Sequence, residues 1–356
     1  MNKKITILGI ESSCDETAVS IIQQENTQIK ILSNIVSSQF DIHKEFGGVV
    51  PELAARAHVE KIDVIAKKAI KESNIKLNDI DAIAATAGPG LIVCLTVGLN
   101  FGKTLAASLK KPFIAVNHLE GHALSPRLNT YLEFPYLLLL ISGGHTQYLS
   151  VKGLGNYKRL GTTIDDALGE AFDKTAKIIG IEFPGGPKIE NYAEHGDKNR
   201  FKLPKPILNR GGCNLSFAGL KTAILRIKPE IKTKKDKFDL SASFQKTIEE
   251  ILNEKTKKAF EIYLKDSDFL KKTFVVAGGV AANKGIKKNL VELSKKNGFE
   301  CLFPDISLCS DNAAMIALVG LEKYKKKKFD GLSFKVNPRW QLDEDAKFLK
   351  GAGVKI

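Results

Sequence analysis

The chain has 356 residues, of which 43% are hydrophobic and 26% charged, and this balance excludes a disordered or fibrous protein. Its length favours two packed domains, and its five cysteines, odd in number and without a CxxC pair, predict a reduced, cytoplasmic protein. The formal net charge of +14 would attract a polyanion such as a nucleic acid, although widely spread lysines give the same charge without one. The longest apolar run, 136–141, has the length of a strand, so no membrane span is expected.

A β-hairpin is the first predicted element, and its pattern occurs twice. Residues 5–22 and 137–151 each contain an apolar strand, a tight turn of small polar residues or glycine, and a second strand with β-branched residues. Such a turn offers backbone N–H groups to an anion. Two turns of this kind that face each other would hold a polyphosphate between two lobes.

Helices and strands alternate along the rest of the chain. Helices are predicted at 51–71, 93–109, 244–263, 283–297 and 312–324, and strands at 81–86, 112–116 and 274–277. This alternation predicts an α/β architecture, and the duplicated hairpin narrows it to the two-lobed class of actin, hexokinase and Hsp70. We expect an N-terminal lobe at 1–130, a C-terminal lobe at 131–310 with the active cleft between the two, and a C-terminal segment at 311–356 that packs back on the N-terminal lobe.

Two histidines that follow the strand at 112–116 have the spacing of metal ligands. In a helix, His118 and His122 lie on one face, where two imidazoles can share one ion. Asp311 is the candidate third ligand; because it stands just before a predicted helix, an N-cap is the alternative explanation, and Cys309 is another candidate ligand. Two histidines and a carboxylate suit Fe(II) or Zn(II).

Glycine turns mark two further candidate positions. The segment 276–283 has the pattern of a strand, a Gly-Gly turn and the start of a helix, which would let a planar ring or a phosphate approach the backbone. Residues 183–188 form a rigid, glycine-bearing loop after the acid-rich helix 165–174. Asp173 of that helix could bind a ribose or a metal, but from the residues alone a solvated helix face explains it better.

Short motifs from both halves of the chain together resemble those of one family, the bacterial TsaD family of tRNA N6-adenosine threonylcarbamoyltransferases, formerly labelled glycoproteases. The matches keep their order from residue 5 to about residue 340. They lie at 11–17, 47–52, 88–91, 117–122, 142–146, 169–174, 216–221 and 277–283.

The resemblance implies roles for individual residues. The metal-ligand positions correspond to His118, His122 and Asp311, and we expect one divalent ion there, Fe(II) in preference to Zn(II). Glu11, in the first turn beside Asp15, is the candidate catalytic residue. Some relatives carry an aspartate at one of the substrate positions, where this chain has a glutamate at residue 190. The positions that bind the threonylcarbamoyl-adenylate correspond to Ile141, Ser142, Gly143, Gly144, His145, Asp173, Gly186, Glu190 and Asn283.

The implied reaction is acyl transfer to tRNA. The N6 amine of the adenosine at tRNA position 37 attacks the carbamoyl carbon of threonylcarbamoyl-AMP, and a metal ion orients the adenylate and stabilises the developing charge. The lysines of 232–237 and 325–328 are the candidate tRNA contacts, with a merely solvated surface as the alternative. The resemblance also implies two cytoplasmic partners, a paralogous inactive homologue (TsaB-like) and a small P-loop ATPase (TsaE-like), besides a separate enzyme that makes the adenylate.

Three other functions are alternatives to this one. A kinase or ATPase of the same fold would use Asp15 with Mg-ATP and no histidine-bound metal. A metalloprotease would need a glutamate directly after the first histidine, where Leu119 stands. A non-catalytic paralogue would lack the histidine pair.

Overall fold

The computed structural model describes residues 4–46, 48–266 and 271–347. The chain divides into two compact units, the first formed by Met1–Leu132 with Pro304–Glu344 and the second by Glu133–Phe303 with Asp345–Ile356. Each unit is built on its own five-stranded sheet. Helices pack on both sheets, which confirms the predicted α/β class.

The first unit contains a sheet with the strand order β3-β2-β1-β4-β5. Strands β1, β2 and β3 are antiparallel neighbours, whereas β4 runs parallel to β1 and β5 runs parallel to β4. The pair β1–β2 is the first predicted hairpin. The strands are β1 (Ile5–Glu11), β2 (Glu16–Glu25), β3 (Gln28–Ser38), β4 (Ala82–Gly88) and β5 (Phe113–Asn117).

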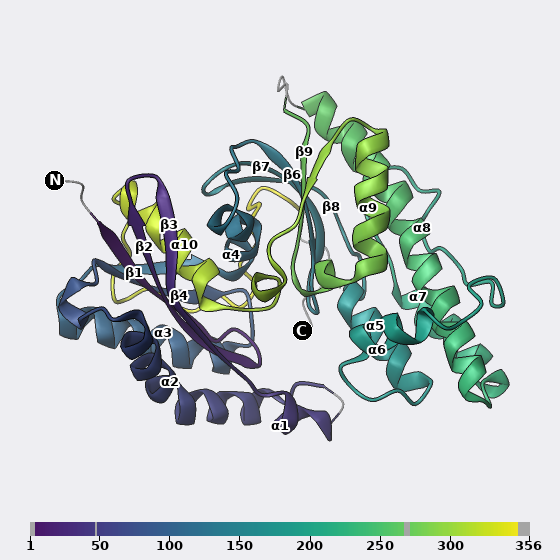
Figure 1. The fold of residues 1–356 in the computed structure, drawn as a ribbon, viewed down its shortest axis with the longest axis horizontal. Coiled ribbons are helices and arrows are strands. Elements are labelled where there is room, and N and C mark those ends of the chain that lie inside the picture. The colour runs from purple at the N-terminus through teal and green to yellow at the C-terminus, as the bar shows by residue number, and fades with distance from the viewer. Residues whose placement is uncertain (1–3, 47, 267–270, 348–356) are drawn as a thin grey trace. The chain divides into compact units, whose positions relative to one another are not determined.

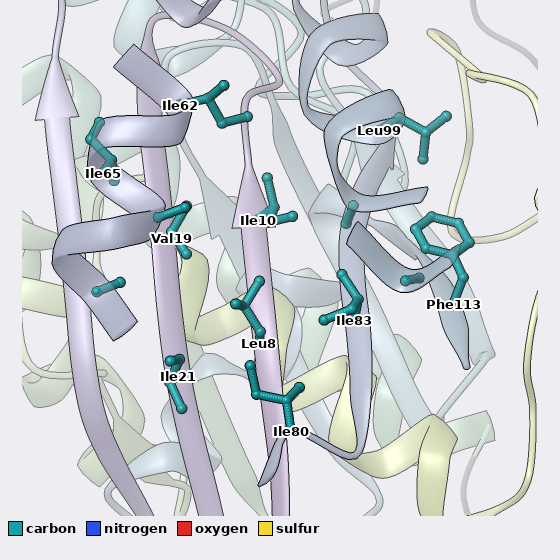
Figure 2. Close-up of a cluster of buried hydrophobic side chains, with 14 of the residues drawn as sticks. Leu8, Ile10, Val19, Ile21, Ile62, Ile65, Ile80, Ile83, Leu99 and Phe113 are labelled. Atoms are coloured by element: carbon teal, nitrogen blue, oxygen red, sulfur yellow. The ribbon is translucent and has the colours of Figure 1, made fainter. Parts of the chain in front are cut away.

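Helices cover both faces of this sheet, which is why its central strands are apolar along their whole length (Figure 1). On one face, Leu8 and Ile10 of β1 share a core with Ile62 and Ile65 of α2 and Leu99 of α3 (Figure 2). The helices of this unit are α1 (Phe40–Lys44), α2 (Pro51–Ser73), α3 (Ile92–Leu109), α4 (His118–Leu124) and α10 (Ala313–Lys325).

Helix α10 lies close against the opposite face. Because side chains alternate along a strand, Gly9 points away from the core beneath α2 and toward α10. A Cβ atom on Gly9 would lie 2.4 Å from the carbonyl oxygen of Ala313, and one on Gly320 would lie 2.6 Å from the Cβ of Ala84. Small residues on β1, β4 and α10 therefore allow the helix to lie close to the sheet. This packing also determines where the segment before α10 lies.

In the part of the chain that the structure describes, α3 is the one helix that is long and apolar enough to cross a membrane by length and composition. It packs against β4 and α2, and Leu95, Leu99 and Ala106 are among its buried residues. This packing accounts for an apolar face. Asn100 and Lys103 interrupt the apolar residues of α3. A search for long uninterrupted apolar runs, on which the expectation of no membrane span depends, therefore does not find this helix.

The second unit repeats the strand order of the first. Its sheet has the order β10-β9-β6-β7-β8, with β6, β7 and β8 antiparallel, β9 parallel to β6, and β10 parallel to β9. The two predicted hairpins therefore open two separate sheets. The strands are β6 (Tyr136–Ile141), β7 (Thr146–Gly153), β8 (Asn156–Thr162), β9 (Thr273–Ala277) and β10 (Glu300–Leu302), and the helices are α5 (Leu168–Ile178), α6 (Gly185–Ala193), α7 (Ala218–Ile227), α8 (Lys234–Asp266) and α9 (Lys284–Lys296).

Two helices differ from the sequence-based prediction. Helix α8 begins at Lys234 and not near residue 244, because Thr233 and Asp236 cap its start. The backbone N–H of Asp236 donates to the Thr233 hydroxyl at 3.1 Å, and the N–H of Thr233 donates to the Asp236 carboxylate at 2.7 Å. The predicted rigid loop at 183–188 is in part the first turn of α6, which begins directly after Pro184.

Candidate functional site

Helix α4 is short and carries two histidines on one side. The side-chain oxygen of Asn117 accepts hydrogen bonds from the N–H groups of Leu119 and Glu120, at 2.9 and 3.4 Å, and this N-cap starts the helix at His118. The rings of His118 and His122 lie edge to face with their centroids 4.7 Å apart, and both side chains are buried. The predicted spacing on one helix face is confirmed.

Asp311 faces both imidazoles. Its Oδ1 atom lies 2.9 Å from Nε2 of His122 and 3.6 Å from Nε2 of His118. The cap of α10 is the side chain of Asn312, which accepts a hydrogen bond from the N–H of Met315. The capping explanation for Asp311 is therefore wrong.

These three side chains lie close enough together to hold a metal ion. Among the described residues they form the one group of three whose ligand atoms all lie within 4.8 Å of one another. Cys309, the other candidate, donates instead to the carbonyl oxygens of Pro304 and Asp305, at 3.7 and 3.5 Å. Two imidazoles and a carboxylate fit a first-row divalent ion, and three protein ligands leave positions open for water or substrate.

Glu11, the candidate catalytic residue, lies behind His118 and not among the three ligands. Its Oε2 atom accepts a hydrogen bond from Nδ1 of His118 at 3.0 Å and another from the Thr86 hydroxyl at 2.6 Å, while Oε1 accepts from the N–H of Ser13 at 2.6 Å. Since Nδ1 is held in this way, Nε2 is the atom of His118 that faces Asp311 and is available to an ion.

The charges of this group act on one another. Burial alone would lower the pKa of His118, but the carboxylates of Asp311 and Glu11 outweigh it and raise the pKa to about 9. Burial alone would raise the pKa of Glu11, but the charge of His118 and its hydrogen bond hold that pKa below the usual value. At neutral pH the imidazole of His118 in the metal-free protein is therefore protonated, and a bound cation would replace this proton.

In the second unit, the predicted substrate turn follows β6. Ile141 ends the strand and is buried; the N–H of Ser142 then donates to the carbonyl of His145 at 2.8 Å, and the N–H of His145 donates to the Ser142 hydroxyl at 3.0 Å. Gly143 and Gly144, between them, are exposed, and a Cβ atom on either would meet nothing within 4 Å. The backbone of this turn is open to a ligand.

The start of α5 packs directly against that turn. The N–H of Leu168 donates to the Thr146 hydroxyl at 2.9 Å, and the N–H of Gly169 donates to the carbonyl of Ser142 at 3.1 Å. A Cβ atom on Gly169 would lie 2.8 Å from the Cα of Gly143. A glycine at residue 169, where the motif 169–174 begins, is therefore needed for this approach.

Asp173, one turn further along α5, holds the start of α6. Its Oδ1 atom accepts a hydrogen bond from the N–H of Gly185 at 2.7 Å. The adjacent Gly186 has open space beside it, because an added Cβ would meet nothing within 4 Å. The solvated helix face that the residues alone favoured for Asp173 is wrong, since the side chain is partly buried and has this partner.

Glu190 and Asn283 come together at the start of α9. The Glu190 carboxylate accepts a hydrogen bond from the N–H of Lys284, and the Asn283 side chain caps the helix by accepting from the N–H of Ile286 at 2.9 Å. The same amide exchanges two hydrogen bonds with Gln245 of α8, at 3.0 and 3.1 Å. Gln245 was missed because it belongs to no motif and approaches Asn283 only in the folded chain.

Comparison with known proteins gives one consistent family. The family model described as tRNA N6-adenosine threonylcarbamoyltransferase matches residues 30–318. A protein of that name from Pelagibacter ubique (strain HTCC1062) is 70% identical over 100% of both chains. Proteins of the same name from Rickettsia rickettsii (strain Sheila Smith) and Ruegeria sp. (strain TM1040) are 54% identical over 96% of this chain and 99% of the relative, and 49% identical over 100% and 99%.

Solved structures resemble the chain in fold. HypF from T. kodakarensis matches 92% of this chain and 49% of its own length with a TM-score of 0.61, and a full-length HypF in the phosphate- and nucleotide-bound form matches 92% and 48% with a TM-score of 0.59. Identity is 14% in both cases, so these likenesses concern the fold alone. Together with the repeated strand order they confirm the predicted duplicated, actin-like α/β fold.

Proposed function

Because the chain belongs to the tRNA N6-adenosine threonylcarbamoyltransferase family, it transfers a threonylcarbamoyl group to N6 of an adenosine in tRNA, and we propose that His118, His122 and Asp311 hold a divalent ion for this reaction. The relative at 70% identity over the whole of both chains carries the assignment of the reaction. The convergence of three ligand side chains supports the metal proposal. Membership of this family argues against the three alternatives, a kinase or ATPase, a metalloprotease and a non-catalytic paralogue.

The donor that we propose is threonylcarbamoyl-AMP, and the acceptor is the adenosine next to the anticodon. The N6 amine forms a bond to the carbamoyl carbon, the bond from that carbon to the phosphate oxygen breaks, AMP leaves, and N6 gives up one proton. Because the donor is already activated, the chain needs no side-chain nucleophile. The adenosine must leave its stack to react, as bases of single-stranded loops can.

The proposed ion is Fe(II), with Zn(II) as the alternative. When bound, it would supply a Lewis acid for an oxygen of the adenylate. His118 and His122 would bind through Nε2, while Glu11 keeps the proton of His118 on Nδ1. Both oxygens of Glu11 are already engaged by residues of the first unit, which supports a role in positioning His118 and not in direct catalysis.

We propose that the adenylate binds at the turn 142–145 and at the start of α6 in the second unit. The exposed N–H groups of Gly143 and Gly144 suit a phosphate or a developing negative charge. Asp173, Glu190 and Asn283 bind neighbouring backbone groups, which supports a role in shaping this surface.

tRNA is the acceptor, and we propose its contacts at two largely exposed lysine clusters, 232–237 before and within the first turn of α8 and 325–328 at the end of α10. Part of this charge is paired, since Lys235 lies 3.4 Å from Asp239 and Lys325 lies 3.8 Å from Glu322. A TsaB-like paralogue, a TsaE-like ATPase and a cytoplasmic location complete the proposal. Mass analysis of tRNA nucleosides after reconstitution tests the transfer itself.

Metal affinity is expected to rise with pH. Binding at Nε2 requires neutral His118, whose pKa in the metal-free protein is raised to about 9, so each bound ion displaces one proton below that pH. The apparent dissociation constant for Zn(II) should fall about tenfold per pH unit from roughly pH 7 and level off at higher pH. Titration against a competing chelator at several pH values measures this.

Stability of the metal-free protein should change in the opposite direction. The folded pKa of His118 is above the unfolded value of roughly 6.5, so its stabilising contribution is complete below pH 6.5 or so and is lost as the pH rises through about 9.

The Zn(II) titration also tests the raised pKa of His118. A Zn(II) affinity that does not change with pH between roughly 7 and about 9 would mean that His118 is already neutral in the metal-free protein.

Gly169→Ala is expected to weaken donor binding. The new methyl group would lie 2.8 Å from backbone atoms of Ser142 and Gly143, so the turn must move. We expect KM for the adenylate to rise on the order of tenfold and stability to fall by about 1–3 kcal/mol. The control is Gly153→Ala, at the end of β7, where an added Cβ meets nothing within 4 Å. Equal KM values for the two variants would contradict a role of the turn in donor binding.

A further inference from the structure

Glu120 stands between the two ligand histidines in the sequence but on the other side of their helix. Its side chain is 4% exposed, and Oε2 lies 3.5 Å from Nζ of Lys323, near the end of α10. Residues two apart on a helix point in widely different directions, so Glu120 faces away from His118 and His122. No role in the reaction described above requires it.

Helices α4 and α10 are in contact at a glycine. A Cβ atom on Gly121 would lie 3.0 Å from Cγ of Met315 and 3.1 Å from Cδ1 of Ile316. Asp311 precedes α10, and Lys323 lies in its last turns. Helix α10 thus meets α4 at the ligand carboxylate, at the glycine contact and at the ion pair of Glu120.

Lys323 is itself fixed by the surrounding structure. Its ammonium group donates a hydrogen bond to the carbonyl of Ala115 in β5 at 3.0 Å and lies 5.8 Å from the centre of the Trp340 ring. The carbonyl of Trp340 accepts a hydrogen bond from the side chain of Asn117, the N-cap of α4, at 3.1 Å. The ion pair therefore joins α4 to the strand before it and to the segment after α10.

We propose that Glu120, through Lys323, is a positioning residue that sets the rotation of α4 and thereby the placement of both histidines relative to Asp311. The inference rests on the proposed metal centre. Helix α4 has only seven residues, so its own length does little to fix its rotation. A rotation of about 10° moves a side-chain atom roughly 6 Å from the helix axis by about 1 Å, which is more than the tolerance of about 0.5 Å of a working metal site.

The test compares Co(II) binding by the full chain and by the variants Glu120→Gln, Lys323→Met and the double variant. Co(II) reports both affinity and geometry, because its visible absorption depends on the ligand arrangement. We expect each single variant to raise the dissociation constant for Co(II) on the order of tenfold and to change the absorption spectrum, although all three ligands remain. The double variant should be no worse than Glu120→Gln alone, since the two residues act as one pair.

The matched control is Glu322→Gln. This variant removes an acid of α10, next to Lys323 in the sequence, that pairs with Arg127 and Lys325, both at 3.8 Å. It should bind Co(II) as the unaltered chain does, whatever it does to thermal unfolding. Wild-type Co(II) binding and spectrum in Glu120→Gln and Lys323→Met, even with lowered stability, would overturn the positioning role. Should Glu120→Gln not fold, Lys323→Met carries the comparison. Undiminished Co(II) binding by the His118→Ala/His122→Ala variant is a different result, which would overturn the metal centre itself.

Discussion

Replacing both proposed ligand histidines, as His118→Ala with His122→Ala, is expected to abolish binding of the proposed ion and with it the transfer of the threonylcarbamoyl group. Asp311 then remains as a single carboxylate, which cannot hold a transition metal against water. Loss of the Lewis acid should lower the transfer rate on the order of 10³-fold or more. Elemental analysis of the loaded and desalted protein measures the ion, and the modified nucleoside measures the transfer.

The control for this prediction is His195→Ala. His195 is exposed, lies just after the end of α6 and donates a hydrogen bond through Nδ1 to the carbonyl of Asn191, outside the ligand group. It should keep the full metal content. A double variant with the metal content of the unaltered chain would show that the ion is bound elsewhere.

Glu11→Gln is expected to weaken metal binding although no ligand is removed. The carboxylate of Glu11 accepts hydrogen bonds from Nδ1 of His118 and from the N–H of Ser13. An amide has one oxygen, so in either orientation its NH₂ group meets one of these donors. If His118 moves its proton to Nε2 to avoid this, that atom can no longer bind an ion. We expect metal affinity to fall on the order of 10–100-fold.

Two measurements separate this effect from simple destabilisation. The pKa of His118 in the metal-free variant, followed by NMR, should drop below about 9, because one of the two carboxylates that raise it is gone. Thr86→Val removes a hydrogen bond to Glu11 but keeps the carboxylate, so it should weaken metal binding less. Unchanged affinity and an unchanged pKa in Glu11→Gln would contradict the positioning role of Glu11.

The parts of the site that local patterns determine could be predicted from the sequence. The spacing of His118 and His122 places both on one face of a helix, whatever the rest of the fold does. The two hairpins follow from apolar strands on either side of small polar turns. For Asp311 the residues alone left both a ligand and an N-cap open, and the structure removes the second, because Asn312 is the cap.

The supporting contacts could not be predicted, because they join residues far apart in the sequence. Glu11 meets Thr86 through the register of β1 and β4, in which Ile10 pairs with Ala85. Glu120 meets Lys323 only because α10 packs against α4 in the folded chain. No single sequence carries a signal for such pairs.

Mass analysis of tRNA nucleosides decides whether the chain modifies the adenosine next to the anticodon. The metal-loaded chain is incubated with unmodified tRNA, the enzyme that makes the adenylate, and the proposed TsaB-like and TsaE-like partners. We expect the adenosine next to the anticodon to gain a threonylcarbamoyl group, and we expect His118→Ala/His122→Ala in the same mixture to leave it unmodified. Unmodified adenosine in the complete mixture would contradict the transferase account, and full modification by the double variant would contradict its metal centre.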